Sequence, residues 1–169
     1  MKKLFALVLA LCLLCGCTAL ADNTIAWEEV EPLLETSGVN GNFQTFDQIA
    51  VALFIPEGLQ EVDLPDDSYI GYYAAEDGSA VAVQYVNVEG MDLETYTAAL
   101  PGVGATEIET GTVNGLPCVT YAVPANKTMN IAFTTEAGYI LEVAIGPVED
   151  DNAKTAAGII MASIQAVPQ

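Results

Sequence analysis

Few kinds of side chain in this sequence are suited to catalysis. Its 169 residues include no histidine and no arginine. Histidine is the commonest general base and metal ligand, and arginine is the residue that grips a phosphate or carboxylate with two parallel hydrogen bonds. A Ser-His-Asp or Cys-His site therefore cannot be assembled, and no glycine-rich phosphate loop joins an expected strand to a helix. These missing residue types argue against an enzyme, and we predict no catalytic residue and no cofactor.

Cysteine is the strongest nucleophile that the sequence offers. Three of the four cysteines lie within the first 17 residues, and the fourth is Cys118. A thiol becomes reactive when a neighbouring base or cation lowers its pKa, and no His or Arg exists to do so. We interpret Cys118 as a small apolar residue buried on a strand. Once the N-terminal segment is removed, a single thiol remains and no intramolecular disulfide can form.

Carboxylates are abundant, with 23 Asp and Glu residues. Calcium takes about six to eight oxygen ligands, often from several carboxylates, but neither acidic cluster has the Asp-x-Asp-x-Asp-Gly spacing of an EF-hand. We interpret the clusters as solvated loop acids and helix caps, with calcium binding as the alternative. The weak candidate metal ligands are Asp63, Asp66 and Asp67 in one loop, and Glu149, Asp150 and Asp151 at a helix start. Two carboxylates could also cleave a glycoside, although the sequence selects no pair.

Aromatic and small residues leave two further alternatives open. The seven tyrosines could form a platform for sugars, but at strand spacing we interpret them as core and cross-strand partners. Tyr72 and Tyr73 are adjacent, so they must point to opposite faces of a strand. Alanines recur along the expected strands, which lets a helix approach the sheet closely. The functional alternative is a shallow groove for a peptide or a lipid.

The N-terminal segment has the pattern of a bacterial secretory signal. Lys2 and Lys3 precede an apolar stretch from Leu4 to Cys15, which is shorter than the roughly 20 residues that span a bilayer. Small residues at 19 and 21 fit cleavage after Ala21. Residues 14–17 also resemble a lipoprotein box, which would leave a lipid-modified Cys17 as the N-terminus. Both alternatives place the mature protein outside the cytoplasm, and it would contact the membrane only if Cys17 is lipidated.

The charge of the mature chain limits its partners. The whole sequence carries a formal charge of −19. Without Lys2 and Lys3, two lysines would oppose all 23 carboxylates, for a charge of −21. Nucleic-acid binding needs clustered Lys and Arg on phosphates, so this field disfavours DNA, RNA and anionic membranes. It favours solubility, and it would attract cations or basic partners.

Helical spacing occurs near the start, the middle and the end of the mature chain. Trp27, Val30 and Leu33 predict a short helix that ends by Gly38 and is followed by a turn-rich linker to residue 42. Asp92 is placed to cap a helix over residues 93–100. Asp150 or Asp151 can cap a final helix with an apolar stripe. That stripe consists of Ala153, Ala157, Ile160 and Ile164.

Between residues 43 and 145 the apolar residues mostly alternate, which is typical of strands. A run over 49–55 is apolar on both faces, which favours a sheet covered on both sides. Glu76-Asp77-Gly78-Ser79 and Asn114-Gly115 are turn signals that predict hairpins. The remaining predicted strands are 69–75, 80–88, 106–113, 116–123, 129–135 and 139–145, of which the last four form a meander.

Four short segments occur in a characteristic order. They are an extended strand from Phe46 to Ile55 that is followed by Pro56-Glu57-Gly58, the helix start Asp92-Leu93-Glu94-Thr95-Tyr96, the hairpin Asn114-Gly115-Leu116-Pro117 leading to Tyr121, and the helix end Ala162-Ser163-Ile164. In order and spacing, over about residues 43–167, these segments resemble the PsbP/DcrB-like superfamily. The resemblance implies an α/β/α sandwich. Members include photosystem-associated, exported bacterial and GTPase-binding proteins, and most are not enzymes. The resemblance supplies no catalytic motif, and this chain lacks the basic residues with which some members dock.

We therefore predict an α+β fold, namely an α/β/α sandwich with a central, mostly antiparallel sheet of about six to seven strands and helices on both faces. Residues 1–21 are predicted to be the signal peptide, 22–42 a helical segment and linker, and 43–169 the PsbP/DcrB-like domain. The predicted function is a non-catalytic, exported or lipid-anchored protein that binds an unknown protein or other component of the bacterial cell envelope. The alternatives are a carboxylate-dependent hydrolase acting on glycans and a calcium-dependent adhesion module.

Overall fold

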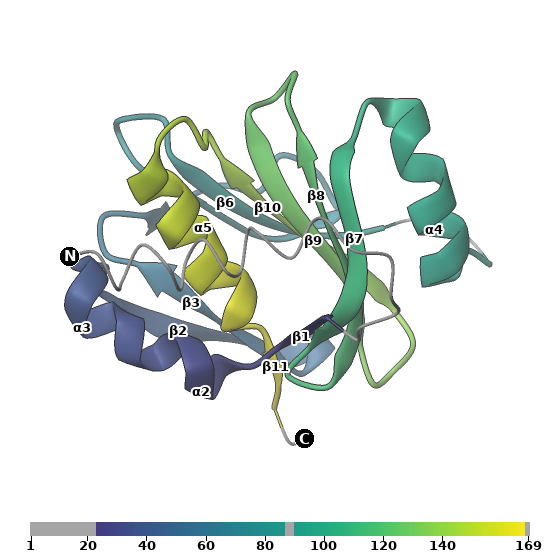
Figure 1. Cartoon of the computed structure of the whole chain (residues 1–169), viewed down its shortest axis with the longest axis horizontal. Helices are drawn as coiled ribbons and strands as arrows, with labels where there is room; N and C mark the ends of the chain where they lie inside the picture. Colours follow the sequence, from purple (N-terminus) through teal and green to yellow (C-terminus); the bar gives the residue numbers. More distant parts are fainter. Residues whose placement is uncertain (1–22, 87–89, 168–169) are drawn as a thin grey trace.

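Two sheets and four α-helices make up the part of the chain that the computed structural model describes, residues 23–86 and 90–167 (Figure 1). The strands are β1 (Asn23–Ile25), β2 (Gly41–Phe46), β3 (Val51–Pro56), β4 (Gln60–Glu61), β5 (Tyr69–Ala74), β6 (Ala80–Tyr85), β7 (Thr106–Val113), β8 (Leu116–Val123), β9 (Thr128–Thr134), β10 (Ile140–Gly146) and β11 (Gln165–Ala166). The α-helices are α2 (Trp27–Val30), α3 (Leu34–Ser37), α4 (Leu93–Ala99) and α5 (Asp151–Ala162). Three short 3₁₀ helices cover Glu31–Leu33, Asp47–Ile49 and Leu100–Val103.

The large sheet has the strand order β1-β7-β8-β9-β10-β6-β5-β4. The hairpin β5–β6 and the meander β7–β10 confirm the predicted strands to within a residue or two at most ends; the end predicted at residue 88 lies outside the described residues. Its two edge strands, β1 and β4, are too short to leave an alternating pattern. β1 runs parallel to β7, and it approaches closely because residue 111 is glycine. A Cβ there would lie 2.0 Å from the carbonyl oxygen of Asn23.

A second sheet with the order β11-β3-β2 corrects one prediction. The sequence predicted a single strand from Phe46 to Ile55. Instead, Phe46 ends β2, a 3₁₀ turn follows, and Ala50 takes a left-handed conformation with φ of 52°. The chain therefore reverses, and β2 pairs antiparallel with β3. No glycine or proline lies between Phe46 and Val51, so the sequence carries no strong turn signal at this reversal.

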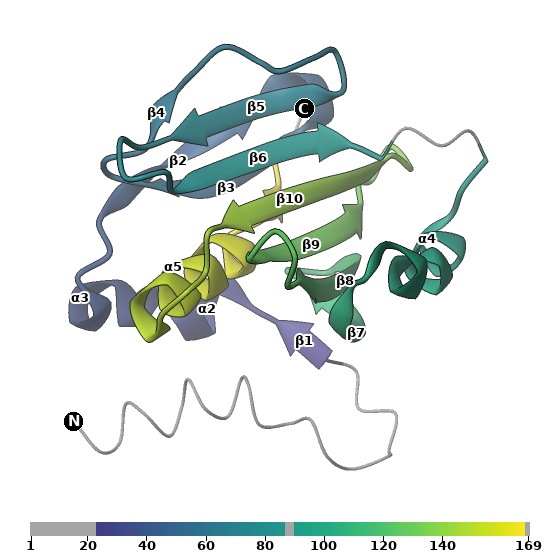
Figure 2. The ribbon, with the colours of Figure 1, turned by 90° about the horizontal axis from the view of Figure 1, so that it is seen from above.

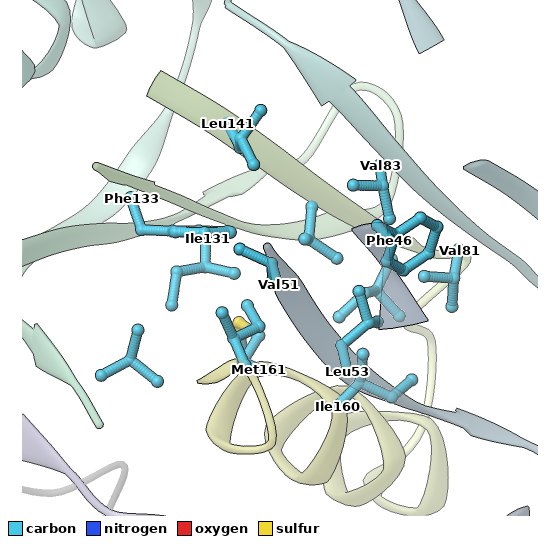
Figure 3. Close-up of a cluster of buried hydrophobic side chains, with 14 of the residues drawn as sticks. Phe46, Val51, Leu53, Val81, Val83, Ile131, Phe133, Leu141, Ile160 and Met161 are labelled. Atoms are coloured by element: carbon cyan, nitrogen blue, oxygen red, sulfur yellow. The ribbon is translucent and has the colours of Figure 1, made fainter. Parts of the chain in front are cut away.

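The main core lies between one face of the large sheet and a layer formed by the small sheet and α5. Figure 2 shows β2 and β3 beside β5 and β6, and Figure 3 shows core side chains from both sheets and α5 meeting. Phe133, Leu53 and Ile160 are essentially inaccessible there. On the outer side of this layer, α2 and α3 pack against α5 and β3.

Helix α4 covers the opposite face of the large sheet, over β8 and β9. Its neighbours include Val119 and Ala132, which alternate with the main-core residues along the same strands. The predicted caps of α4 and α5 are confirmed. The carboxylate of Asp92 accepts the Thr95 N–H, and that of Asp150 accepts the Ala153 N–H, both at 2.8 Å. With helices on both faces of a mostly antiparallel sheet, the predicted fold class is confirmed.

Candidate binding site

The predicted acidic clusters have structural partners. In the first, Asp66 accepts hydrogen bonds from the backbone N–H and the hydroxyl of Ser68, and these bonds lower the pKa of its carboxyl group. Asp63 and Asp67 lie exposed beside it. Within the described residues, no three Asp, Glu, His or Cys side chains are grouped so as to hold a metal ion. Calcium binding by Asp63, Asp66 and Asp67 stays a prediction.

The second cluster lies at the start of α5. Asp150 is the helix cap, Asp151 is in the first turn, and Glu149 forms an ion pair with Lys127. Each of these carboxylates is exposed, and two of them are already engaged within the fold. Calcium binding here also stays a prediction. Cys17, the predicted lipidation site, lies outside the described residues.

Cys118 is buried on β8, with 2% of its surface exposed. Burial raises the pKa of its thiol from 9.0 to about 12. The thiol therefore stays protonated at neutral pH and is shielded from solvent, which confirms the interpretation of Cys118 as a small buried residue.

A cluster of two tyrosines and a glutamate ties α4 to the large sheet. The hydroxyls of Tyr96 on α4 and Tyr121 on β8 are 2.7 Å apart, and the Tyr96 hydroxyl donates to Oε2 of Glu142 on β10 at 3.1 Å. Burial first, and then the charge of Glu142, raise the pKa of both phenols well above the ordinary value of 10.0. The hydroxyls thus remain neutral donors, which suits a structural tie and not a general base.

The raised pKa values of Tyr96 and Tyr121 should make the free energy of unfolding depend on pH in the alkaline range. Above pH 10 an unfolded chain releases the Tyr96 and Tyr121 protons while the folded chain retains them. The folded state then binds more protons, and its free energy of unfolding falls as the pH rises. The Cys118 thiol adds to this fall between pH 9.0 and about 12. We expect Tyr96→Phe to show a shallower fall than the wild type in urea unfolding between pH 9 and pH 11. Equal pH profiles for the two proteins would contradict the buried cluster.

The free edge of β2 is six residues long and mostly exposed. β2 is the end strand of the small sheet, and its residues 42–45 are exposed. The Glu57 N–H donates to the Asn40 carbonyl oxygen at 2.7 Å, which fixes the alternation of an antiparallel pair. Residues 42, 44 and 46 therefore bond to β3. The N–H and C=O groups of Gly41, Phe43 and Thr45 point away from β3, toward the edge.

A cavity of about 350 Å³ opens beside this edge, between the small sheet and β4–β5. Asn42 and Gln44 line it from β2, because their side chains lie on the face of β2 that carries Phe46 into the core. Ile55 and Pro56 of β3, Gly58, and Leu59 also contribute. Gly41, Phe43 and Thr45 lie on the other face, where the Phe43 ring packs edge-on against Trp27 and Phe54.

The walls of this cavity carry negative charge. Glu57 and Glu61 line it together with Tyr73, and none of the lining residues is basic. Burial and the charge of Glu61 raise the pKa of the Tyr73 phenol, so that hydroxyl is a neutral hydrogen-bonding group beside a carboxylate. The arrangement provides amides, a phenol and two carboxylates, which are the groups that a cationic or hydrogen-bonding ligand needs.

A second cavity, of about 310 Å³, lies where β3 and β11 meet the turn between β9 and β10. Its lining is mainly apolar and includes Ile49, Leu116 and Val167, with Glu136 and Tyr139 among the remaining residues. Tyr139 is 55% exposed, and its ring packs edge-on against Tyr85. The end strand beside this cavity, β11, is only two residues long, whereas β2 has six, so we regard the first cavity and the β2 edge as the candidate site.

Sequence reasoning missed this site. Glu57 and Glu61 are isolated acids in the sequence, and Asn42 and Gln44 fall in a segment that was predicted to be partly linker. The signal that existed was the sequence Gly-Asn-Phe-Gln-Thr-Phe at 41–46, which carries no charge and no proline. The prediction that Tyr72 and Tyr73 point to opposite faces of a strand is confirmed. Tyr73 is a core residue, and Tyr72 points to the other face of the sheet.

Comparison with known proteins defines the fold. No protein-family model and no curated sequence matches the chain. The solution structure of cyanobacterial PsbP (CyanoP) from Synechocystis sp. PCC 6803 aligns with a TM-score of 0.53 at 12% identity, covering 74% of this chain and 91% of CyanoP. This chain has a PsbP-like fold. The resemblance predicted from the sequence is thereby confirmed at the level of the fold.

A second solved structure is more distant. The crystal structure of the Saccharomyces cerevisiae Ran-binding protein Mog1p aligns with a TM-score of 0.47 at 13% identity, covering 76% of this chain and 96% of that protein. At such identities the similarity concerns the arrangement of strands and helices and not the residues of a site. Among the helices of the described residues, none is long and apolar enough to cross a membrane.

Proposed function

We propose that this protein is an exported, non-catalytic binding domain that recognises a component of the bacterial cell envelope. The observation that carries the proposal is the cavity of about 350 Å³ beside the unpaired edge of β2. Binding sites are typically concave and combine an apolar lining with a few polar groups. This cavity combines Ile55 and Pro56 with amides, a phenol and two carboxylates.

The chemistry of the side chains supports binding over catalysis. The chain contains no histidine, its mature part retains one thiol, and that thiol is buried with a raised pKa. The buried phenols of Tyr96 and Tyr121 are hydrogen-bonded to each other and remain protonated. The PsbP-like fold is compatible with a binding role, but it does not select a ligand.

Export is part of the proposal and rests on the first 21 residues. Lys2, Lys3 and the following apolar stretch have the order of a secretory signal. Cleavage after Ala21 would release the domain, and modification of Cys17 would anchor it to the membrane. The high negative charge of the mature chain suits either location, because it favours solubility and repels nucleic acids.

The proposal is tested on protein recovered from a bacterial producer. Its intact mass is expected to correspond to a chain that starts at Asp22 or at a lipid-modified Cys17. A thermal-shift screen of envelope components, including wall glycans, lipid vesicles, calcium and envelope proteins, should then yield a saturable ligand. At 100 times its dissociation constant, such a ligand stabilises the fold by about 2.7 kcal/mol, which raises Tm by roughly 5–10 °C.

Four results would contradict the proposal. An unprocessed chain in the cytoplasm would remove the export part, and a flat screen would remove the binding part. Release of reducing sugar from wall glycans would favour the carboxylate-dependent hydrolase instead. Stabilisation by calcium alone, reversed by chelation, would favour the calcium-dependent adhesion module.

A further inference from the structure

We infer that the free edge of β2 and the cavity beside it bind an extended, basic segment of a partner protein, which adds to the small sheet as a fourth strand. This inference rests on the proposed binding function and specifies the chemistry of the partner. Strand addition is a common way of recognising peptides, in which the backbone supplies affinity and pockets for alternate side chains supply specificity.

The β2 edge lacks the features that usually prevent strand addition. Exposed edges are commonly blocked by charged residues, by proline, by a bulge or by a covering element. Residues 41–46 contain no charged residue and no proline, and the pairing with β3 runs without a register shift. In the large sheet, by contrast, part of β5 is covered because the two-residue strand β4 pairs with it. The backbone groups available to pair with an added strand are the outward N–H and C=O of Gly41, Phe43 and Thr45.

The cavity would select the side chains of the added strand. Side chains on one face of a sheet lie beside one another in neighbouring strands. Residues of the incoming segment next to Asn42 and Gln44 therefore point to the same side as these amides, into the cavity. There they meet the carboxylates of Glu57 and Glu61, which no basic residue of the cavity wall neutralises. A Lys or Arg at every second position meets this pattern.

Charge also distinguishes between possible occupants. A second copy of the chain would bring its own formal charge of −19 to the edge, and an anionic lipid surface would be repelled as well. A basic segment is attracted by the net charge of the whole protein and by the local carboxylates. The occupant that fits the edge is therefore a protein segment with alternating basic residues.

The test uses the mature protein and a synthetic peptide of about nine residues in which Lys alternates with Val or Thr. Calorimetry at about 0.15 M salt limits non-specific attraction. The control peptide has the same sequence with N-methylated amides on the pairing edge, so it keeps its charge but loses its donors. We expect saturable binding of the first peptide and at least about tenfold weaker binding of the second.

Two pairs of variants separate the contribution of backbone pairing to peptide binding from that of the cavity charges. Thr45→Pro removes an outward N–H without removing a bond to β3, and Thr45→Val keeps that N–H. Glu57→Gln combined with Glu61→Gln removes the cavity charges, and Glu94→Gln removes an exposed charge on α4. We expect Thr45→Pro and the double Gln variant to weaken binding about tenfold or more, and the two controls to stay within about twofold.

Amide hydrogen exchange gives an independent readout of where the peptide binds. The N–H groups of Phe43 and Thr45 face the edge, whereas those of Asn42 and Gln44 already bond to β3. Binding is expected to slow exchange at Phe43 and Thr45 by at least about tenfold and to change the other two much less. This measurement needs no variant, so it remains decisive even if Thr45→Pro does not fold.

The outcomes separate this inference from the proposed function. Equal binding of both peptides, or protection elsewhere in the chain, would overturn the strand-addition site. No peptide binding together with a saturable ligand in the envelope screen would overturn the basic-segment inference and leave the binding function intact. The absence of any ligand in both experiments would overturn both.

Discussion

Phe133→Ala is expected to lower the free energy of unfolding by about 3–5 kcal/mol. Phe133 lies on β9 with essentially none of its surface exposed, in the cluster that joins the large sheet to β3 and α5. Truncation removes the burial of an aromatic ring and leaves a cavity that a layer of two sheets and a helix cannot readily fill. A domain of this size is stabilised by only about 5–15 kcal/mol. The midpoint of urea unfolding should therefore fall strongly with little change in slope.

Phe43→Ala provides a matched control for this core truncation. The Phe43 side chain is 39% exposed and packs edge-on against Trp27 and Phe54 on the outer face of the small sheet. The same truncation there should cost about 1–2 kcal/mol, since less surface is lost and no closed cavity forms. Equal losses for the two variants would mean that Phe133 is not at the centre of the core.

Asn114→Gly is expected to cost about 3 kcal/mol, the second large effect. The amide nitrogen of Asn114 donates to the carbonyl oxygens of Ala162 and Ile164 at 2.8 and 2.7 Å, and its Oδ1 accepts the Trp27 N–H at 2.7 Å. Each of these bonds contributes roughly 1 kcal/mol, and their loss would leave partly buried groups without partners. One side chain in the β7–β8 turn thus holds both the end of α5 and the start of α2.

Glycine is the informative substitution because Asn114 has a positive φ of 46°. Glycine adopts that conformation without strain, so the loss contains no native-state strain, and the Asn126→Gly control accounts for the added freedom of the unfolded chain. Asn114→Ala should cost about 1 kcal/mol more, because it adds the left-handed strain. The matched control is Asn126→Gly in the exposed β8–β9 turn, which should change stability by less than about 0.5 kcal/mol. If Asn114→Gly and Asn126→Gly cost the same in urea unfolding, the three side-chain bonds do not stabilise the protein.

The similarity to a known fold does not by itself define the candidate site. The alignment with CyanoP, at 12% identity, concerns the order of strands and helices. The cavity depends on particular residues, including Asn42, Gln44, Glu57 and Glu61. In the proposed binding function those residues select the ligand, and the peptide and variant experiments address them directly.

Local patterns in the sequence determined much of the fold. The alternation from residue 69 onward predicted β5–β10, and the turn signals at Asp77-Gly78 and Asn114-Gly115 marked two hairpins. Asp92 and Asp150 predicted the starts of α4 and α5, because a cap is a contact over three residues and so is visible in sequence. The lack of histidine and the large negative charge limit the chemistry of the chain in whatever way it folds.

The tertiary structure alone decided what depends on contacts between distant residues. The reversal at Ala50 split a predicted strand into β2 and β3, because no glycine or proline marks the turn between Phe46 and Val51. The outer edge of β2 is free because the third strand of the small sheet, β11 from the end of the chain, pairs with β3 and not with β2. The carboxylates Glu57 and Glu61 become a site only when β2 and β5 lie in facing layers. Residue types and local spacing can therefore be predicted from the sequence. A free strand edge and a cavity depend on how distant segments pack, so they cannot.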